Sequence, residues 1–192
     1  MKLLAWHHVI DNGFTTTPEF KGVRKDITAA IAAITWPPGA REFTLNPTRE
    51  GNGVKPIKDA FVEVLVARGW LPETRPRRLD AECTFEDGLK FGAEWETGNI
   101  SSSHRAINRM LLGAFDGELR GGILAVPSRA TYRFLTDRVG NFQELVPYLP
   151  LWSSYGRVLP SKAYLGIVVF EHDALDENVP TITKGTDGRA LI

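Results

Sequence analysis

Residues 79–97 read LDAECTFEDGLKFGAEWET, and the fold can be worked out from this stretch. Two segments of strand-like composition flank the tripeptide EDG, which ends at Gly88. A three-residue hairpin loop needs a left-handed backbone at its last position, and glycine adopts that conformation without steric cost. We therefore predict two antiparallel strands, and the register that this loop imposes places Asp80 opposite Glu94.

The predicted hairpin gathers acidic side chains on one face. Side chains along a strand alternate between the faces of a sheet, so Glu94 and Glu96 point to the same side, and Asp80 joins them across the hairpin. Converging carboxylates repel one another, and Mg²⁺, which prefers oxygen ligands, relieves that repulsion. The spacing predicts a magnesium site suited to phosphodiester chemistry. The alternative is a solvated acidic face that pairs with the arginines within residues 75–78.

The segments before the hairpin have helical periodicity. Isoleucines at helical spacing predict a helix over residues 24–36, which the two following prolines end. A polar loop over residues 46–55 leads into a second predicted helix. This helix begins at Pro56, because proline suits the first turn of a helix, and it ends at Gly69.

The segments after the hairpin alternate between helix and strand. A helix follows Gly98, and we expect Ser101, Ser102 or Ser103 to cap it. Further elements are predicted as buried strands over residues 121–126 and 163–170, helical stretches near 128–136 and 141–149, and a loop over 182–192. Strands that alternate with helices predict an α/β fold with a central mixed sheet and helices on both faces.

Composition and charge narrow the class of protein. The chain has 192 residues, 43% of them hydrophobic and 24% charged, which is typical of globular proteins. Its 23 basic and 23 acidic residues cancel, which excludes a polycationic tail protein. One cysteine excludes an intrachain disulfide. The longest apolar run, residues 163–170, is too short to span a membrane. We expect a single domain over residues 1–192 in a soluble, cytoplasmic protein.

Four motifs, in order along the chain, carry a resemblance to a known family. They are NGVKPIK at 52–58, GAEWETGNISSSHR at 92–105, YRFLTDRVGNFQELVPY at 132–148 and NVPTITKGTDG at 178–188. Together they resemble the BamHI-type type II restriction endonucleases, which have the PD-(D/E)XK nuclease fold. The resemblance implies Mg²⁺-dependent hydrolysis of double-stranded DNA at the palindrome GGATCC, with Mn²⁺ as a possible substitute. It also implies a homodimer, no membrane association and a separate companion DNA methyltransferase in a restriction-modification system.

The resemblance assigns roles at the acidic hairpin. Asp80, Glu94, the main-chain carbonyl of Trp95 and Glu73 match metal ligands, and Glu96 matches a general base that replaces the usual lysine. Because the hairpin is a few residues shorter than in the family, the choice between Asp80 and the neighbouring acid at position 82 stays open.

The resemblance also assigns residues that contact DNA. Asn99, Ser101 and Arg105 match residues that face base edges in the major groove, and Asp137-Arg138 match a pair that reads a G·C base pair. This chemistry is suitable, because arginine pairs with guanine and aspartate accepts from cytosine. A further segment, Lys184, Gly185 and Thr186, matches a loop that approaches the minor groove.

The family pattern is not kept everywhere. A C-terminal helical extension of the family has no counterpart, and Phe115-Asp116 stand where the family has a basic pair. We therefore expect a dimer interface that is built differently. Two alternatives remain open, a PD-(D/E)XK nuclease of other specificity and a DNA-binding relative that does not cleave. Two further clusters, His7-His8 and Glu171-His172-Asp173, are expected to be structural and not metal sites.

Overall fold

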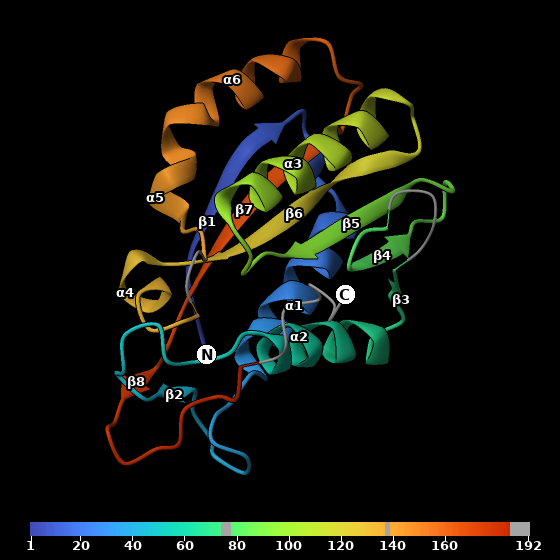
Figure 1. Ribbon diagram of the computed structural model, residues 1–192. Coiled ribbons are helices and arrows are strands. Elements are labelled where there is room, and N and C mark those ends of the chain that lie inside the picture. Colours follow the sequence, from blue (N-terminus) through green and yellow to red (C-terminus); the bar gives the residue numbers. More distant parts are fainter. Residues whose placement is uncertain (74–77, 137–138, 185–192) are drawn as a thin grey trace, which may run out of the picture.

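A computed structural model describes residues 1–73, 78–136 and 139–184. Its centre is a six-stranded mixed sheet in the order β1-β7-β6-β5-β4-β3 (Figure 1). The strands are β1 Lys2–Asp11, β3 Leu71–Pro72, β4 Ala81–Thr84, β5 Lys90–Trp95, β6 Leu119–Pro127 and β7 Tyr164–Glu171. The β5-β6-β7 strands are parallel to one another, and the other pairs are antiparallel.

Helices cover both faces of this sheet, as predicted. The α-helices are α1 Pro18–Ala32, α2 Lys55–Ala67, α3 Ile100–Phe115, α4 Arg129–Tyr132, α5 Phe142–Leu145 and α6 Leu149–Ser154. In Figure 1, α1 and α2 lie below the sheet and α3, α5 and α6 lie above it. A small parallel sheet of β2 Thr44–Leu45 and β8 Ala174–Leu175 lies beside the N-terminus. No helix in the described ranges is long and apolar enough to cross a membrane.

The sheet separates two hydrophobic cores. Along β7, Val168 and Phe170 belong to the core between the sheet and the helices α1 and α2. Ile167 and Val169 belong to the core between the sheet and the helices α3, α5 and α6. This division follows from the alternation of side chains along a strand that is buried on both faces. The strand therefore reads as a continuous apolar run.

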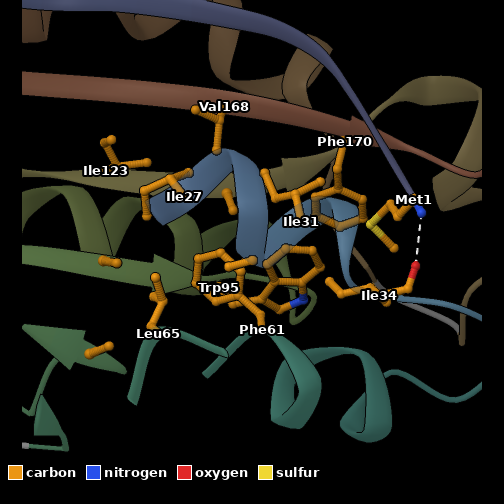
Figure 2. Packing of buried hydrophobic residues seen from close by; sticks show 14 of the residues in the cluster. Met1, Ile27, Ile31, Ile34, Phe61, Leu65, Trp95, Ile123, Val168 and Phe170 are labelled. Atoms are coloured by element: carbon orange, nitrogen blue, oxygen red, sulfur yellow. Dashed lines mark hydrogen bonds between the residues drawn. The ribbon is translucent and has the colours of Figure 1, made fainter. Parts of the chain in front are cut away.

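Figure 2 shows the first core, in which aromatic rings from a helix and two strands meet. The indole of Trp95 stacks on the ring of Phe170 with 4.1 Å between centroids, and Phe61 of α2 lies 4.8 Å away. Ile27 and Ile31 of α1 are fully buried against this group. The end of β5, which carries the acidic residues, is thereby fixed from below.

The first helix differs from its prediction at both ends. It begins at Pro18, six residues earlier than expected, because Thr17 caps it by accepting a hydrogen bond from the Phe20 N–H (3.2 Å). The isoleucine pattern missed this first turn, which buries Phe20 and Val23 instead. The helix ends at Ala32, before the prolines are reached.

Two other parts of the fold were predicted incompletely. The edge strand β1 was not predicted, and its pairing with β7 contains two register irregularities, which break the alternation that identifies a strand. The helical stretches expected near 128–136 and 141–149 are short helical segments, and α4 and α5 each have only 4 residues. Short segments of this kind depend on tertiary packing and not on their own propensity.

Candidate active site

The hairpin has the predicted register. Ala81 pairs with Ala93, so the next position places Asp80 opposite Glu94. The turn depends on Gly88, whose φ of +84° is in the left-handed region that other residues rarely adopt. The local sequence alone therefore sets the positions of these two carboxylates.

The carboxylate of Asp80 joins three elements. It is 6% exposed. One oxygen, Oδ2, accepts a hydrogen bond from the main-chain N–H of Trp95 (2.9 Å), and the other, Oδ1, accepts one from Lys58 Nζ of α2 (2.6 Å). A buried charge needs such partners to offset its lost hydration. Asp80 is therefore held rigidly at the end of β5.

The carboxylate of Glu94 has a strongly raised pKa. It is 4% exposed, and its Oε1 lies 2.6 Å from Nη2 of Arg109 on α3. This ion pair is not aligned for a hydrogen bond, so Oε1 is buried without a donor in the described part of the chain. Burial raises the pKa of Glu94 to about 8, and the negative charge of Asp80 adds to that effect against Arg109 and Lys58.

Glu96 lies two residues further, where the sheet opens to solvent. Its Oε1 accepts a hydrogen bond from the Gly98 N–H (2.7 Å). Burial raises the pKa of Glu96, the Gly98 bond lowers it and the charge of Asp80 raises it again, with a net rise. Glu96 borders an open pocket of about 400 Å³ that also includes Ser102, Arg105, Asn108, Arg109 and Leu112.

Lys58 of α2 also lies at this site, next to Asp80. Burial lowers the pKa of Lys58, but the hydrogen bond and charge of Asp80, together with Glu94 and Glu96, raise it overall. The ammonium group therefore stays charged beside the three carboxylates. Lys58 lies 22 residues before Asp80, and only the packing of α2 under the hairpin brings the two together.

The oxygen atoms at this site are suitable ligands for a hard divalent cation. Glu96 N–H donates to the carbonyl of Ala125 on β6 (2.9 Å), so in a parallel ladder the main-chain groups of Trp95 face the other way, toward Asp80. The Trp95 carbonyl and the donor-free Glu94 Oε1 are oxygen ligands of the kind that Mg²⁺ takes. In the described ranges no three His, Cys, Asp or Glu side chains are grouped closely enough to hold a metal by themselves.

The structure distinguishes Asp80 from Glu82. The Glu82 carboxylate is buried and pairs with Lys90 Nζ at 2.6 Å, away from Trp95. Glu73 follows β3, and its main-chain N–H lies 3.4 Å from the carbonyl of Asp80, while its side chain is exposed. The geometry therefore favours Asp80 over Glu82, and it brings the main chain of Glu73 next to the site.

The first turn of α3 presents the candidate base-reading residues. The helix is capped by Asn99, whose Oδ1 accepts from the Ser102 N–H (3.2 Å), and not by one of the serines as predicted. An asparagine side chain reaches this N–H as well as serine does, so the residue before the helix takes the position. Ser101 and Arg105 are exposed, and Arg105 Nη2 donates to Ser102 Oγ at 2.7 Å.

The other predicted DNA-contact residues lie in or next to parts of the chain that the structure does not describe. Asp137 and Arg138, and likewise Gly185 and Thr186, lie outside the described residues. Lys184 is described and is exposed.

Three arginines that the sequence analysis missed gather near Thr136 and Val139. Arg49, Arg129 and Arg133 border an open pocket of about 450 Å³, together with Glu50, Tyr132, Thr136 and Val139. Arg49 lies 80 residues before Arg129 in the sequence, so no single motif contains all three arginines.

The clusters His7-His8 and Glu171-His172-Asp173 make contacts within the fold. His8 Nδ1 lies 2.8 Å from the Tyr164 hydroxyl, and the His7 ring stacks on Phe142 at 4.2 Å. In the second cluster, Glu171 accepts from Ser128 Oγ (2.7 Å) and His172 Nδ1 lies 2.8 Å from Thr131 Oγ1. Both clusters therefore have structural partners, and the expectation that neither is a metal site stays a prediction.

Comparison with known sequences gives consistent matches over the whole length. The family model described as "Restriction endonuclease BamHI" matches residues 1–189. The type II restriction enzyme OkrAI of Oceanobacter kriegii is 45% identical over 199 aligned positions, which cover 100% of both chains. The type II restriction enzyme BamHI of Bacillus amyloliquefaciens is 34% identical, over 85% of this chain and 80% of that protein.

Comparison with solved structures gives the same fold. The restriction endonuclease BglII in complex with a DNA 16-mer superposes with a TM-score of 0.65 over 96% of this chain and 90% of that one, at 11% identity. Free BglII gives a TM-score of 0.57 over 90% and 81%, at 13% identity. At such identities the likeness concerns the fold alone.

Proposed function

The chain belongs to the BamHI family of restriction endonucleases and is a type II restriction enzyme, and we propose that it cleaves GGATCC as a Mg²⁺-dependent homodimer. The observation that carries the proposal is the buried pair of carboxylates, Asp80 and Glu94, opposite each other at the open end of β5. Such a pair is costly to bury unless a cation compensates it.

The chain's residues divide the chemistry among them. Asp80, Glu94 and the Trp95 carbonyl would hold Mg²⁺, with Glu73 as a further acid. A bound Mg²⁺ would supply positive charge to the phosphodiester as the bond breaks. Glu96 orients the attacking water and accepts its proton. Its raised pKa suits this role, because a general base works best when its pKa approaches the operating pH.

Lys58 and Arg109 supply fixed positive charge to this site. Without a metal they neutralise Asp80 and Glu94, at 2.6 Å each. In bound DNA the scissile phosphate would lie at the proposed metal site. Lys58 and Arg109, which contact the carboxylates of that site, would then lie near the phosphate as well. This arrangement compensates for the absence of a lysine at the Glu96 position.

The specificity is proposed from the matching residues. Asn99, Ser101, Arg105, Asp137 and Arg138 would read base edges in the major groove, and Lys184, Gly185 and Thr186 would approach the minor groove. The exposed Asn99 and Ser101 at the start of α3 and the arginine pocket beside Thr136 support a DNA-facing surface here. Arginine side chains of this kind bind phosphates of the duplex.

A palindromic site calls for a protein with two-fold symmetry, in which each subunit reads one half and cuts one strand. We therefore expect a homodimer, a mass of twice 21.3 kDa in solution, and a cytoplasmic location beside the DNA. A companion DNA methyltransferase would protect the host genome without being a stable subunit.

Digestion of a plasmid that contains a single GGATCC site tests the proposal. We expect one cut at that site with Mg²⁺, slower or altered cutting with Mn²⁺, and none with EDTA. Cutting at another sequence would contradict the specificity and leave the carboxylate chemistry in place. Tight binding to GGATCC without any cutting would contradict the nuclease activity and favour the binding relative.

A further inference from the structure

Three segments that are far apart in the sequence meet at Asn52. Its side chain is fully buried, in the loop that precedes α2. Nδ2 donates to the carbonyls of Asn46 and Phe134, both at 2.9 Å, and Oδ1 accepts from the Ile182 N–H at 3.1 Å. One side chain thus bonds to its own loop, to the segment after α4 and to the segment near the C-terminus.

Main-chain hydrogen bonds reinforce the same junction. Asn52 N–H donates to the carbonyl of Phe134 (2.9 Å), and its carbonyl accepts from the Thr136 N–H (2.7 Å). The next residue, Gly53, donates its N–H to the carbonyl of Ile182 (2.7 Å). The chain at 52–53 therefore lies between the two other segments and bonds to both.

The junction leaves no room for a side chain at Gly53. A Cβ atom built there would lie 2.2 Å from the carbonyl oxygen of Thr183 and 2.9 Å from the Cα of Lys184. Both contacts are with main-chain atoms, which cannot move aside as a flexible side chain can. Any larger residue at this position must push residues 183–184 away from the loop at 52–53, which itself bonds to the 134–136 segment.

We propose that Asn52 is a positioning residue for sequence recognition, because it sets the spacing between the two segments of chain that reach the DNA. Thr136 directly precedes the predicted major-groove pair, and the Ile182 anchor lies two residues before Lys184, the first of the predicted minor-groove residues. The inference rests on the proposed function. Asn52 itself contacts no base, since it is buried within the protein.

The amide group is chemically required at this position. It offers one acceptor to Ile182 and two donors to the carbonyls of Asn46 and Phe134. An aspartate would keep the acceptor but would place a carboxylate oxygen against two carbonyl oxygens. An alanine would remove all three side-chain bonds inside the protein, which is costly, and only Phe134 would keep its bond to the main-chain N–H of residue 52.

The test compares Asn52→Asp and Asn52→Ala with a control, Asn12→Ala. Asn12 Nδ2 also donates to three distant carbonyls, those of Gly156, Leu159 and Pro160 at 2.9–3.2 Å. It follows Asp11, which pairs with Tyr164 at the start of β7, whereas α4 begins at the other end, where Ser128 N–H donates to the Phe170 carbonyl. For each folded variant, kcat and KM are measured on GGATCC and on sites that differ from it by one base pair.

We expect the Asn52 variants to lose roughly tenfold in the ratio of kcat/KM at GGATCC to kcat/KM at the altered sites, about the loss of one bidentate base contact. Asn12→Ala should lower the melting temperature and leave this ratio unchanged. An unchanged ratio in folded Asn52 variants would overturn the inference, because a residue needed only for stability lowers all rates together. Failure of the unmodified protein to cleave GGATCC would instead overturn the proposed function.

Gly53→Ala provides a second test that retains the Asn52 side chain. We expect it to reduce the same ratio, because its methyl group must displace the main chain at Thr183. Gly22→Ala is the matched control, since a Cβ at Gly22 on α1 meets no atom within 4 Å. A Gly53→Ala variant with the specificity of Gly22→Ala would contradict the proposed spacing.

Discussion

At the scale of single residues, the site depends on which buried acid faces the open end of β5. Asp80 and Glu82 are two residues apart and both nearly inaccessible, yet they have different partners. Asp80 bonds to Trp95 N–H and Lys58, whereas Glu82 pairs with Lys90 on the neighbouring strand. These partners favour Asp80 as the proposed metal ligand, whereas Glu82 neutralises a lysine.

This difference gives a direct mutational prediction. Asp80→Asn should reduce cleavage by several orders of magnitude while DNA binding persists, because one oxygen ligand loses its charge. Glu82→Gln should cleave at close to the original rate. Single-turnover cleavage and gel-shift assays measure the two effects separately. The reverse order of activities would identify Glu82 as the metal ligand.

The buried Glu94 makes stability depend on pH when no metal is present. Its pKa is about 8 in the folded protein against 4.5 for a free glutamate, so the folded state binds more protons between these values. Stability should therefore fall as pH rises from about 4.5 to about 8, by at most about 1.4 kcal/mol per pH unit from this group. In EDTA, Glu94→Gln should gain stability over the unmodified protein as pH increases, measured by thermal unfolding. A constant difference across this range would contradict the raised pKa.

At the scale of elements, the proposed recognition surface combines one helix start with loops from elsewhere. The first turn of α3 directly follows β5, so the acids of the hairpin and the exposed Ser101 and Arg105 are consecutive in sequence and adjacent in space. The α4 segment is different, because its arginines meet Arg49 only through the folding of the chain. The position of Ser101 and Arg105 just after the hairpin acids could be predicted from the sequence, and the meeting of the three arginines could not.

The arginine pocket predicts a salt-dependent contribution to DNA binding. Arg129→Ala and Arg133→Ala should each weaken binding to all sequences alike and lower the slope of log K against log salt by about 1. Arg68→Ala serves as the control, because Arg68 pairs with Asp26 (3.0 Å) on another surface. Titrations at several salt concentrations provide the measurement. Equal slopes for Arg68→Ala and the two α4 variants would exclude phosphate contacts in the pocket.

At the scale of the whole molecule, one sheet with two cores holds the site rigid. The core below the sheet packs α1 and α2 against Trp95, and α2 also delivers Lys58 to Asp80. The core above it packs α3, which delivers Arg109 to Glu94. Each cation of the site therefore comes from a different face of the sheet.

Loss of packing in the core between the sheet and α1 should lower the unfolding free energy much more than it lowers kcat. Ile27→Ala removes a fully buried side chain of α1 and should cost about 2–5 kcal/mol of unfolding free energy. Ile27 is on α1, an element to which no residue of the proposed active site belongs, so the kcat of the fraction that remains folded should be unchanged. Denaturant unfolding and active-site titration measure these quantities. A large fall in kcat at full folding would mean that α1 also positions the site.

The sequence by itself determined the hairpin, its register, the buried strands β6 and β7, and the meeting of Asp80 with Glu94. These features depend on turn geometry and on alternation along a strand, which act over a few neighbouring residues. Only the tertiary structure decided that Lys58 and Arg109 reach those acids, that β1 closes the edge of the sheet, and that Asn52 joins segments 130 residues apart. Contacts over such separations depend on how whole elements pack, and no local pattern in the chain records that packing.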